Sequence, residues 1–506
     1  GTMKTYSLSQ NTSTWQYELT VTPPAPAAYN ATATGNYKIE SYREDPVSHT
    51  KQAVPWEVVG YDTNGDGTFS MTEPLPSWFT SLTTTSGNGS ITSAGETGVA
   101  NLVIASTDKL AAMNAALKLD AKGNASDYYD LSTHDIKGNT TLRNTANCYV
   151  ISHPGYYKIP LVYGNAIKNG GKNENAYKTT NTGPYILTHF KDHNNQDITD
   201  PWIEKTNSGA NNGVNDAKVV WADEAGLVQF GATKIVRDAS NNAFVQFEVP
   251  AATIKNGNAV IAVMKNGTVV WSWHLWFDHA DALDEIPCKN YDGITYKFTR
   301  KTLGQVHIKY EKTSYDQPRK ARITIEQQAG NGGVRASAPV VITQNPENEN
   351  QMATTLYQFG RKDALPGTDA IAQGSYSFDD TPGDHSIGYA IQHPENMLKY
   401  AGGTYDWCNA TYHNLWSMDN IATDWNNNAV VKTIYDPCPA GFHMPASNFF
   451  TGFTINGAWD YGWNFNNKLS SPDATVYFPA AGWRNGDYGM LRYVGVYGCY
   501  WSAIPY

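Results

Sequence analysis

Short runs in which apolar and polar residues alternate recur along the chain and constrain its fold more than any other feature. Trp15–Val21 and Tyr37–Tyr42 alternate with a period of two, as a strand with one buried face requires. Ala243–Val249 and Ala259–Met264 follow one another at the spacing of a β-sandwich, and Val269–Phe277 ends this series as an aromatic strand. Because this period differs from that of a helical face, the pattern predicts a mainly β fold.

The chain is too long to form a single ordinary core. Its 506 residues suggest about three to five domains, and stiff or polar breaks occur at Pro23–Pro26 and Asn345–Asn350. Aromatic residues make up 12% of the chain, with Thr, Asn, Ser and Gly between them, a mixture that favours strands joined by turns. The clearest helical spacing lies over Lys109–Leu119. The predicted domains are an N-terminal strand segment of a preceding module (1–35), a β-sandwich module (36–145), one or more β-sandwich modules (146–345) and a C-terminal domain (346–506).

The balance of charges argues against nucleic acid as a partner. The net charge is −10 and no cluster of Lys and Arg stands out, whereas a phosphate backbone attracts a basic stripe. No run approaches the ~18 apolar residues of a membrane-spanning helix, and no signal peptide opens the chain. Since Gly1-Thr2-Met3 is typical of a processed start, we expect any attachment to a membrane to depend on an anchor outside this chain.

One segment carries the ligand pattern of a calcium-binding loop. Asp62–Glu73 matches an EF-hand loop position by position, with Gly67 at the sharp turn. The flanks differ from those of an EF-hand, because a strand-like run precedes the segment and Pro74 and Pro76 follow it where a helix would begin. A structural turn is the favoured interpretation, since Asn-Gly-Asp-Gly also forms hairpin turns, and bound calcium is the alternative. The calcium ligands would be the side chains of Asp62, Asn64, Asp66, Ser70 and Glu73 and the carbonyl oxygen of Thr68.

A proline-rich loop that contains a cysteine organises the C-terminal region. Each proline of Tyr435–Pro445 fixes φ and removes a backbone donor, so this stretch forms neither a helix nor a central strand. Cys408 and Cys438 are a candidate disulfide pair in an oxidising compartment. A catalytic pair of Cys438 with His443 is the less favoured alternative. The remaining cysteines, Cys148, Cys288 and Cys499, are expected to be buried single thiols.

Two groups of histidines have the spacing of metal ligands or of acid–base residues. His189 and His193 are separated by one helical turn with Asp192 beside them, and His274 lies on the aromatic strand shortly before Asp278. An amphipathic turn and a partly exposed strand histidine are the favoured interpretations of the two groups. The sequence contains no nucleophile elbow, P-loop, dinucleotide-binding loop or HExxH motif. The protein is therefore predicted not to be an enzyme.

Tryptophan is concentrated in the C-terminal region. Most of these side chains are expected in the core, because an indole buries a large apolar surface. A minority on loops would form platforms on which sugars stack. The candidate ligand-binding residues are Trp407, Trp416, Trp483, Arg484 and Trp501.

Four segments from Tyr357 onward resemble the Fibrobacter succinogenes major paralogous domain. They are Tyr357–Asp363, Asp436–Gly441, Phe478–Arg484 and Tyr500–Ser502. The resemblance implies a C-type-lectin-like α+β domain at the C-terminus of a surface protein from Bacteroides-type gut bacteria. The sequence departs from the family pattern Gly-Tyr-Tyr-Trp at Cys499, and no catalytic residue is carried over.

The middle of the chain resembles fimbrillin-like proteins, which are pilus tips or adhesins. The segments that carry this resemblance are Asn147–Val150, Tyr163–Ile167 and Trp271–Trp276. It implies Ig-like sandwich modules that form a stalk beneath a C-terminal binding head.

The observations and resemblances together predict tandem Ig-like β-sandwich modules followed by an α+β C-type-lectin-like domain. The expected function is that of a non-enzymatic cell-surface adhesin at the outer membrane, as a pilus (fimbrial) tip or a related subunit. Its Trp-rich C-terminal domain would bind a host or bacterial surface glycan or protein, and other pilus subunits are further candidate partners. The alternative is a carbohydrate-binding surface lipoprotein or a glycan-processing protein, and the processing of glycans would require a pair of carboxylates in an aromatic cleft.

Overall fold

The computed structural model describes residues 14–381, 385–400, 406–457 and 461–505. Strands account for 39% of the residues and helices for 6%, and many of the sheets are antiparallel, which confirms the prediction of a mainly β fold. Among the described residues, no helix is both long and apolar enough to cross a membrane. The chain forms two compact units: unit 1 consists of Gly1–Lys109 and Tyr310–Glu349, and unit 2 consists of Leu110–Lys309 and Asn350–Tyr506.

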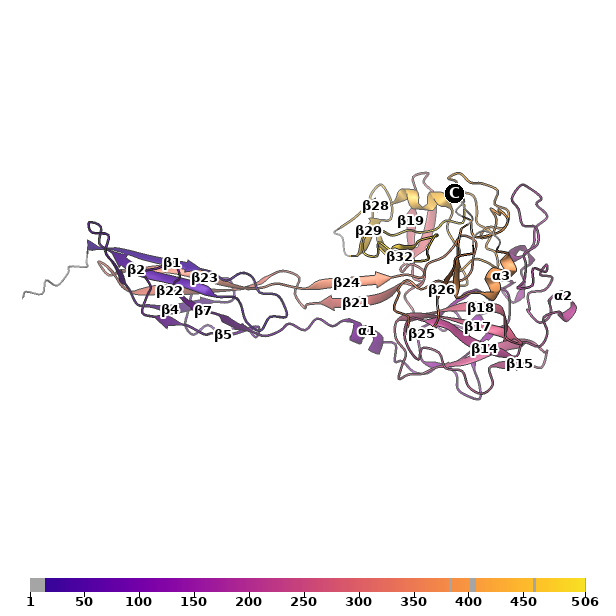
Figure 1. Ribbon diagram of the computed structural model, residues 1–506, viewed down its shortest axis with the longest axis horizontal. Coiled ribbons are helices and arrows are strands. Elements are labelled where there is room, and N and C mark those ends of the chain that lie inside the picture. Colours follow the sequence, from indigo (N-terminus) through magenta and orange to yellow (C-terminus); the bar gives the residue numbers. More distant parts are fainter. Residues whose placement is uncertain (1–13, 382–384, 401–405, 458–460, 506) are drawn as a thin grey trace, which may run out of the picture. The chain divides into compact units, whose positions relative to one another are not determined.

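The described part of unit 1 contains two four-stranded sheets and a two-stranded sheet. In Figure 1, β22 and β23 lie alongside strands of the N-terminal segment. The first sheet consists of β1 (Gln16–Thr22), β2 (Tyr37–Glu44), β3 (Lys51–Ala53) and β7 (Glu96–Gly98). The second consists of β4 (Trp56–Asp62), β6 (Ser86–Gly87), β22 (Arg319–Asn331) and β23 (Val334–Gln344). The two-stranded sheet consists of β5 (Phe79–Leu82) and β8 (Ala100–Leu102), which are antiparallel.

Strands β22 and β23 complete the core of unit 1. β22 pairs with β4 in antiparallel register, which places Ile323 opposite Tyr61 and Ile325 opposite Val58. This division of the chain differs from the expected modules 36–145 and 146–345. The reason is that the apolar faces of β22 and β23 cover those of strands from the N-terminal segment, as packed sheets require. The core includes Tyr37, Ile39, Trp56, Val58, Phe79, Ile323, Ile325, Val340 and Ile342.

Two buried glutamines link the strands of unit 1. Gln327 and Gln344 each follow an apolar run, and both side chains are inaccessible to solvent. Gln327 Nε2 donates to Glu18 O at 2.8 Å and to Ser41 Oγ at 3.0 Å. Gln344 Nε2 donates to Val103 O at 2.9 Å. These side chains satisfy acceptors on neighbouring segments, so the polar residue after each apolar run has a structural role.

The described part of unit 2 contains a five-stranded and a four-stranded sheet. The first has the order β10 (Cys148–Ile151), β18 (Thr268–Phe277), β17 (Gly257–Lys265), β14 (Asp216–Ala222) and β25 (Gln373–Gly374). The second has the order β15 (Ile235–Arg237), β16 (Ala243–Val249), β11 (Gly155–Pro160) and β9 (Tyr129–Asp130). β10 is parallel to β18, whereas β17 is antiparallel to both of its neighbours. β17 and β18 are buried on both faces, which explains their almost continuous apolar sequences.

The remaining regular elements are short helices and small sheets. The described helices are α1 (Leu110–Ala115), α2 (Thr206–Gly209), α3 (Ile387–Gln392) and the 3₁₀ turns η2 (Leu131–Thr133), η3 (Glu174–Ala176) and η4 (Ser447–Gly452). Helix α1 is shorter than the predicted helix over Lys109–Leu119, and Leu117 is buried beyond its end. The paired short strands are β12 (Ile167–Lys168) with β13 (Gly171–Lys172), β19 (Glu285–Lys289) with β20 (Thr295–Thr299), β21 (Val306–Lys312) with β24 (Asn348–Ala353), β26 (Ser377–Asp379) with β27 (Asn396–Leu398), β28 (Thr454–Ile455) with β29 (Gly462–Asn466) and β30 (Thr475–Pro479), and β31 (Trp483–Arg484) with β32 (Leu491–Arg492).

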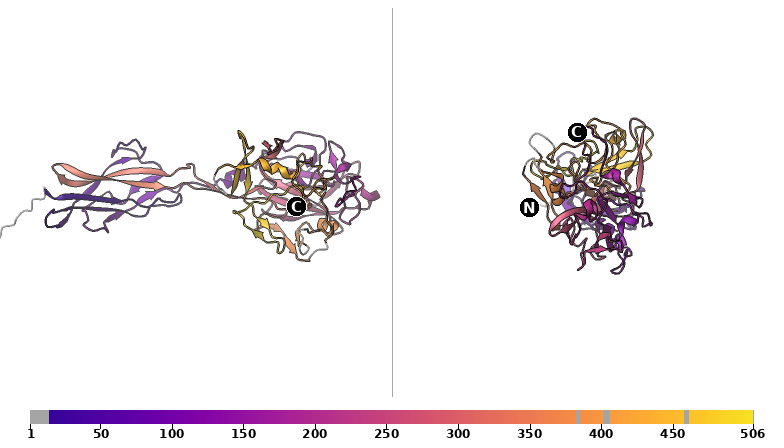
Figure 2. Two further views of the ribbon diagram at one scale, coloured as in Figure 1. Left: turned by 90° about the horizontal axis from the view of Figure 1, so that it is seen from above. Right: turned by 90° about the vertical axis from the view of Figure 1, so that its right-hand side faces the viewer.

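One apolar core of unit 2 extends across the expected domain boundary at residue 345. Trp271 of β18 packs edge to face on Tyr163, with ring centroids 4.9 Å apart, and Tyr435 stacks on Phe190 at 4.6 Å. Trp416 belongs to the same core. Figure 2 shows the orange and yellow C-terminal segments against the magenta strands of unit 2. In this structure residues 346–506 therefore share a core with residues 110–309, which differs from the expected separate C-terminal domain.

Asn147 holds the proline-rich loop beside β10. This buried side chain precedes β10, and its Nδ2 donates to Ile434 O at 2.6 Å and to Asp436 O at 2.8 Å. Asn147 Oδ1 accepts a hydrogen bond from Trp271 Nε1 at 3.0 Å. Next along the chain, Cys148 forms a parallel β-bridge with Pro439. The segment Asn147–Val150 and the proline-rich loop Tyr435–Pro445, which lie far apart in the chain, are thus in contact in unit 2.

Candidate functional site

Unit 2 contains a cavity of about 1250 Å³ whose walls come from distant parts of the sequence. Three of the contributing segments carry C-terminal sequence motifs, namely 438–445, 482–487 and 499–501, and strand β20 and residues 354–357 form further walls. We call it the aromatic cavity, because many of its wall residues have aromatic rings. These residues are Trp276, Tyr296, Phe298, Tyr357, Tyr400, Phe442, Phe449, Phe450, Phe478, Trp483, Tyr500 and Trp501.

Phe298 of β20 is central to one aromatic wall. Its ring centroid lies 5.7 Å from that of Phe450 and 6.3 Å from that of Phe478, in edge-to-face arrangements. Tyr500 lies 5.0 Å from Phe478, and its hydroxyl donates to Pro479 O at 2.6 Å. Such contacts are favourable and fix the positions of the rings. This wall is therefore formed before any ligand binds.

Trp501 lies at the cavity in an orientation fixed by a hydrogen bond. Its Nε1 donates to Tyr357 O at 2.8 Å. The indole contacts Phe359 and Trp416, with ring centroids 6.2 Å apart in both cases. The residue is nevertheless 37% exposed. An indole whose orientation is fixed and whose surface is partly exposed is suited to contact a ligand.

Trp483 lies on β31 and belongs to an exposed aromatic cluster. Its ring centroid is 4.8 Å from that of Tyr493 and 5.7 Å from that of Tyr497. The two tyrosines are each 51% exposed. Because Trp483 also lines the aromatic cavity, the cluster connects the cavity wall with the protein surface.

Trp407 and Trp416 are core residues and not ligand-binding residues, contrary to the prediction. They are 3% and 0% exposed. Trp407 Nε1 donates to Phe359 O at 2.7 Å, and Trp416 Nε1 donates to Tyr435 O at 3.0 Å. Because both the ring surfaces and the polar atoms are already used inside the protein, a ligand cannot reach these side chains.

Arg484 lines the aromatic cavity, but its guanidinium group is bound within the protein. Nε donates to Pro366 O at 2.9 Å, and Nη1 donates to Gly489 O at 3.0 Å. The guanidinium carbon lies 4.0 Å from the ring centroid of Tyr376. Arg484 therefore positions the turn after β31, and its contribution to ligand binding is through the shape of the wall.

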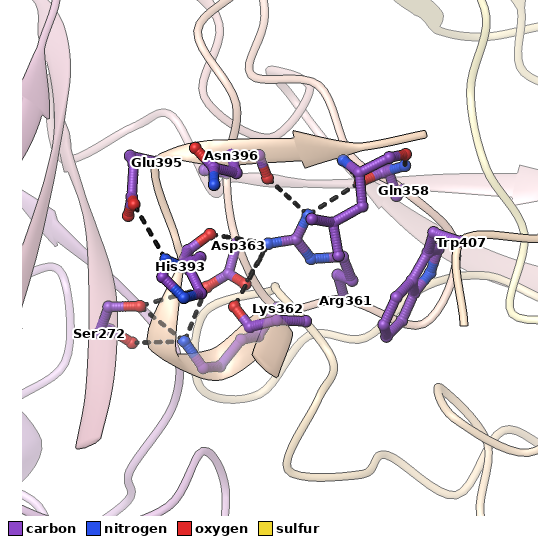
Figure 3. A network of polar contacts seen from close by, with 12 residues as sticks. Ser272, Gln358, Arg361, Lys362, Asp363, His393, Glu395, Asn396 and Trp407 are labelled. Carbon is purple, nitrogen blue, oxygen red and sulfur yellow. Dashed lines mark hydrogen bonds and ion pairs between the residues drawn. The ribbon is translucent and has the colours of Figure 1, made fainter. Parts of the chain in front are cut away.

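Figure 3 shows a buried charged cluster formed by the consecutive residues Arg361, Lys362 and Asp363. The Asp363 carboxylate accepts hydrogen bonds from Arg361 Nη2 at 3.0 Å and from Lys362 Nζ at 2.8 Å. Lys362 Nζ also donates to Ser272 Oγ on β18 at 2.6 Å. Burial by itself raises the pKa of Asp363, but the charges of Lys362 and Arg361 outweigh it and hold the pKa below its ordinary value. The cluster ties the 357–363 motif to β18, so its role is structural.

All five cysteines lie in the described part of the chain, and all are free thiols. The predicted disulfide between Cys408 and Cys438 is therefore not formed in this structure. The two buried thiols have separate surroundings, since Cys408 Sγ lies 3.8 Å from Asn409 Oδ1 and Cys438 Sγ lies 3.7 Å from Met444 Sδ. Burial raises the pKa of Cys408 to about 11 and the pKa of Cys438 well above its usual value, which disfavours a thiolate nucleophile. Cys499 is exposed, in contrast to the expected buried thiol.

His274 is a core residue of β18. It is 2% exposed, and its Nε2 lies 2.7 Å from Asn258 Oδ1. Burial lowers the pKa of His274 to about 3. The prediction of a partly exposed histidine was wrong because β18 is an inner strand that is covered on both faces. Nδ1 of His189 lies 3.6 Å from Asp197 Oδ2, but within the described ranges no group of three or more His, Cys, Asp and Glu is arranged to hold a metal ion.

The Asp62–Glu73 segment of unit 1, for which a structural turn was the favoured interpretation and a calcium loop the alternative, forms a turn held by its own hydrogen bonds. The buried Asp62 carboxylate accepts from Gly65 N at 2.7 Å and from Gly67 N at 3.0 Å. Glu73 Oε1 accepts from Thr63 N at 2.6 Å. Asp62 and Glu73 thus accept hydrogen bonds from backbone amides of the same loop, as the acidic residues of a structural turn do.

Asp62→Ala is expected to lower the free energy of unfolding of unit 1 by about 1–3 kcal/mol, because two amides lose a charged acceptor. Urea unfolding should give the same loss in calcium and in EDTA. Asp66→Ala, at an exposed position of the loop, is the control and should have a smaller effect. A wild-type midpoint that rises with calcium, and an Asp62→Ala midpoint that does not, would instead identify a calcium site.

The sequence patterns did not indicate that β20 and η4 contribute to the site. Tyr296 of β20 stacks on Phe449 of η4, with ring centroids 3.2 Å apart. The alternation of Tyr296 and Phe298 is typical of a strand, but it carries no information about the partners of that strand. Nothing in the local sequence of either segment indicates this contact, because the two segments lie far apart in the chain. The aromatic character of Tyr296 and Phe449 was the one feature that could have suggested it.

No family model, no curated protein and no solved structure matches this chain. The class of protein is thus defined by features of the chain itself, which is mainly β, forms two compact units and has an aromatic cavity in unit 2.

Proposed function

We propose that the protein is a non-enzymatic cell-surface adhesin, a pilus tip or a related subunit, that binds its partner at the aromatic cavity. The observation that carries the proposal is that segments 438–445, 482–487 and 499–501, the last of which contains Trp501, line a single cavity. A large, preformed and mainly apolar cavity with a few polar groups is typical of a binding site. These segments overlap Asp436–Gly441, Phe478–Arg484 and Tyr500–Ser502, which resemble parts of a domain of bacterial surface proteins, and this resemblance supports an extracellular location. An Ig-like topology for the β-sandwich modules within residues 36–345 and a C-type-lectin-like topology for residues 346–506 are part of this proposal.

Trp501→Ala is expected to weaken binding by at least about tenfold, because a central aromatic side chain at an interface often contributes about 2 kcal/mol or more. Binding of the whole chain would be measured on a glycan array and on immobilised extracellular-matrix proteins. Trp425→Ala is the matched control, since Trp425 is 65% exposed and is not among the described residues of the cavity wall. Unchanged binding by a folded Trp501→Ala variant would contradict the assignment of the cavity.

The second candidate is a carbohydrate-binding surface lipoprotein or a glycan-processing protein. The exposed aromatic cluster around Trp483 favours it, since sugar rings stack on such side chains. Two carboxylates, Glu285 and Asp487, line the cavity, and Glu285 forms an ion pair with Lys297 at 2.6 Å. Hydrolysis of a polysaccharide by the wild-type chain, lost in Asp487→Asn, would favour this candidate over the adhesin.

A further inference from the structure

Strand β20 is an edge strand whose free side borders the aromatic cavity. Among the described residues it pairs only with β19, and all five of its residues, Thr295–Thr299, line the cavity. Successive side chains of a strand point to opposite faces. A cavity that touches five consecutive residues therefore borders the edge of the strand, where its main-chain groups lie.

The ladder between β19 and β20 determines which main-chain groups point toward the cavity. At the two ends of the ladder, Arg300 N donates to Asp284 O at 2.8 Å and Asn290 N donates to Ile294 O at 3.0 Å. Hydrogen-bonded and non-hydrogen-bonded pairs alternate along an antiparallel ladder, so the even-numbered residues of β20 bond to β19. The main-chain N–H and C=O groups that point away from β19 belong to the outward residues of β20, which are Thr295, Lys297 and Thr299.

The opposite edge of this hairpin is closed. Pro287 on β19 has no N–H group, and its carbonyl accepts from Asn467 Nδ2 at 2.8 Å. Lys289 N donates to Asn467 O at 2.8 Å. Proline and satisfied main-chain groups are common protections of an edge strand. In contrast, the outward residues of β20 make no main-chain hydrogen bond to residues that the structure describes.

The charges around the cavity suit a segment without net charge. Lys297 pairs with Glu285 at 2.6 Å, and the guanidinium of Arg484 is bound by main-chain carbonyls. Lys399 and Asp487 add one charge of each sign to the wall. Uncharged main-chain donors and acceptors complement this wall better than a polyanion would.

We propose that the aromatic cavity binds an extended segment of a partner polypeptide, which pairs with β20 as a third strand and places alternate apolar side chains among the aromatic rings. This inference rests on the proposed function and names the class of partner. Main-chain hydrogen bonds to the outward residues of β20 supply affinity, and the aromatic wall selects the side chains. A glycan has no regular series of amide donors and carbonyl acceptors to match a strand edge, so a polypeptide fits the observations better.

Peptides selected by phage display against the whole chain test the inference. Lys297→Pro removes one outward N–H. The ladder should tolerate proline there, because residue 297 and Pro287 form a non-hydrogen-bonded pair and the N–H of residue 297 points away from β19. Lys297→Ala is the matched control, since it loses the same side chain but keeps the N–H. For a selected peptide, Lys297→Pro is expected to weaken binding by about tenfold or more, a loss of one hydrogen bond, whereas Lys297→Ala should change it by less than about threefold.

N-methylation of the selected peptide gives a second test that leaves the protein unchanged. Methylation of the amides that face β20 should abolish binding, and methylation of the alternate amides should not. Equal effects of the two methylation patterns would overturn strand pairing. Binding to glycans alone, reduced by Trp501→Ala but not by Lys297→Pro, would also overturn it while supporting the proposed function. Failure of the whole chain to bind any peptide, protein or glycan would contradict both proposals.

Discussion

Asp363→Asn is expected to lower the free energy of unfolding of unit 2 by about 3–5 kcal/mol, the typical cost of removing one partner from a buried ion pair. Asp363 is 4% exposed, and its carboxylate accepts hydrogen bonds from Arg361 and Lys362. An amide of the same shape leaves both cations buried without their counter-charge. Urea unfolding at neutral pH, followed by tryptophan fluorescence, would measure the loss.

Asp369→Asn is the matched control for this substitution. The Asp369 side chain is 75% exposed and lies 3.5 Å from Arg484 Nη1. Solvent screens such a pair, so its loss should cost less than about 1 kcal/mol. Equal losses in the two variants would contradict the structural importance of the charged cluster.

The stabilising contribution of Asp363 should also depend on pH. The pKa of Asp363 is lower in the folded protein than the ordinary value of about 3.9, so its stabilising contribution is complete above about pH 4. That contribution is lost as the pH falls through the folded-state pKa, because the unfolded chain then binds the proton more readily. The wild type should therefore lose more stability on acidification than Asp363→Asn does. Equal losses of stability on acidification in the wild type and in Asp363→Asn would contradict this role of Asp363.

Residues 346–506 produced alone are expected to lack a cooperative unfolding transition. Trp416 and Tyr435 share a core with Trp271 and Phe190, which the fragment does not contain. Without these partners the fragment exposes large aromatic surfaces, and truncation of even one large core side chain typically costs about 3–5 kcal/mol. Thermal unfolding monitored by near-ultraviolet circular dichroism would measure the transition.

The complementary segment provides the control for the fragment. Co-expression of residues 110–309 with residues 346–506 should yield a complex with a sharp transition, because Asn147 then binds the carbonyl groups of Ile434 and Asp436 again. A sharp transition in residues 346–506 alone would instead support the separate C-terminal domain that the sequence suggested.

Local patterns in the sequence predicted strands well but said little about their partners. Ala243–Val249 was predicted as a strand and forms β16 with the same bounds, and Trp15–Val21 nearly coincides with β1. Alternation reports that one face of a segment is buried, which is a local property. The pairing of Ile323 with Tyr61 has no such signal, because it depends on two segments that meet only when the chain folds. The expected domain limits differed from the observed units for this reason.

In the candidate site too, some features follow from the local sequence and others follow only from the tertiary structure. The sequence by itself determined that the chain would be mainly β and that its C-terminal motifs would be rigid and aromatic, since side-chain shape and proline geometry act locally. Only the tertiary structure decided that Trp501 is partly exposed at a cavity while Trp416 is buried. The two residues have the same side chain, and their exposure depends on which distant segments cover them. The free edge of β20 likewise follows from strand pairing, which is a property of the folded chain.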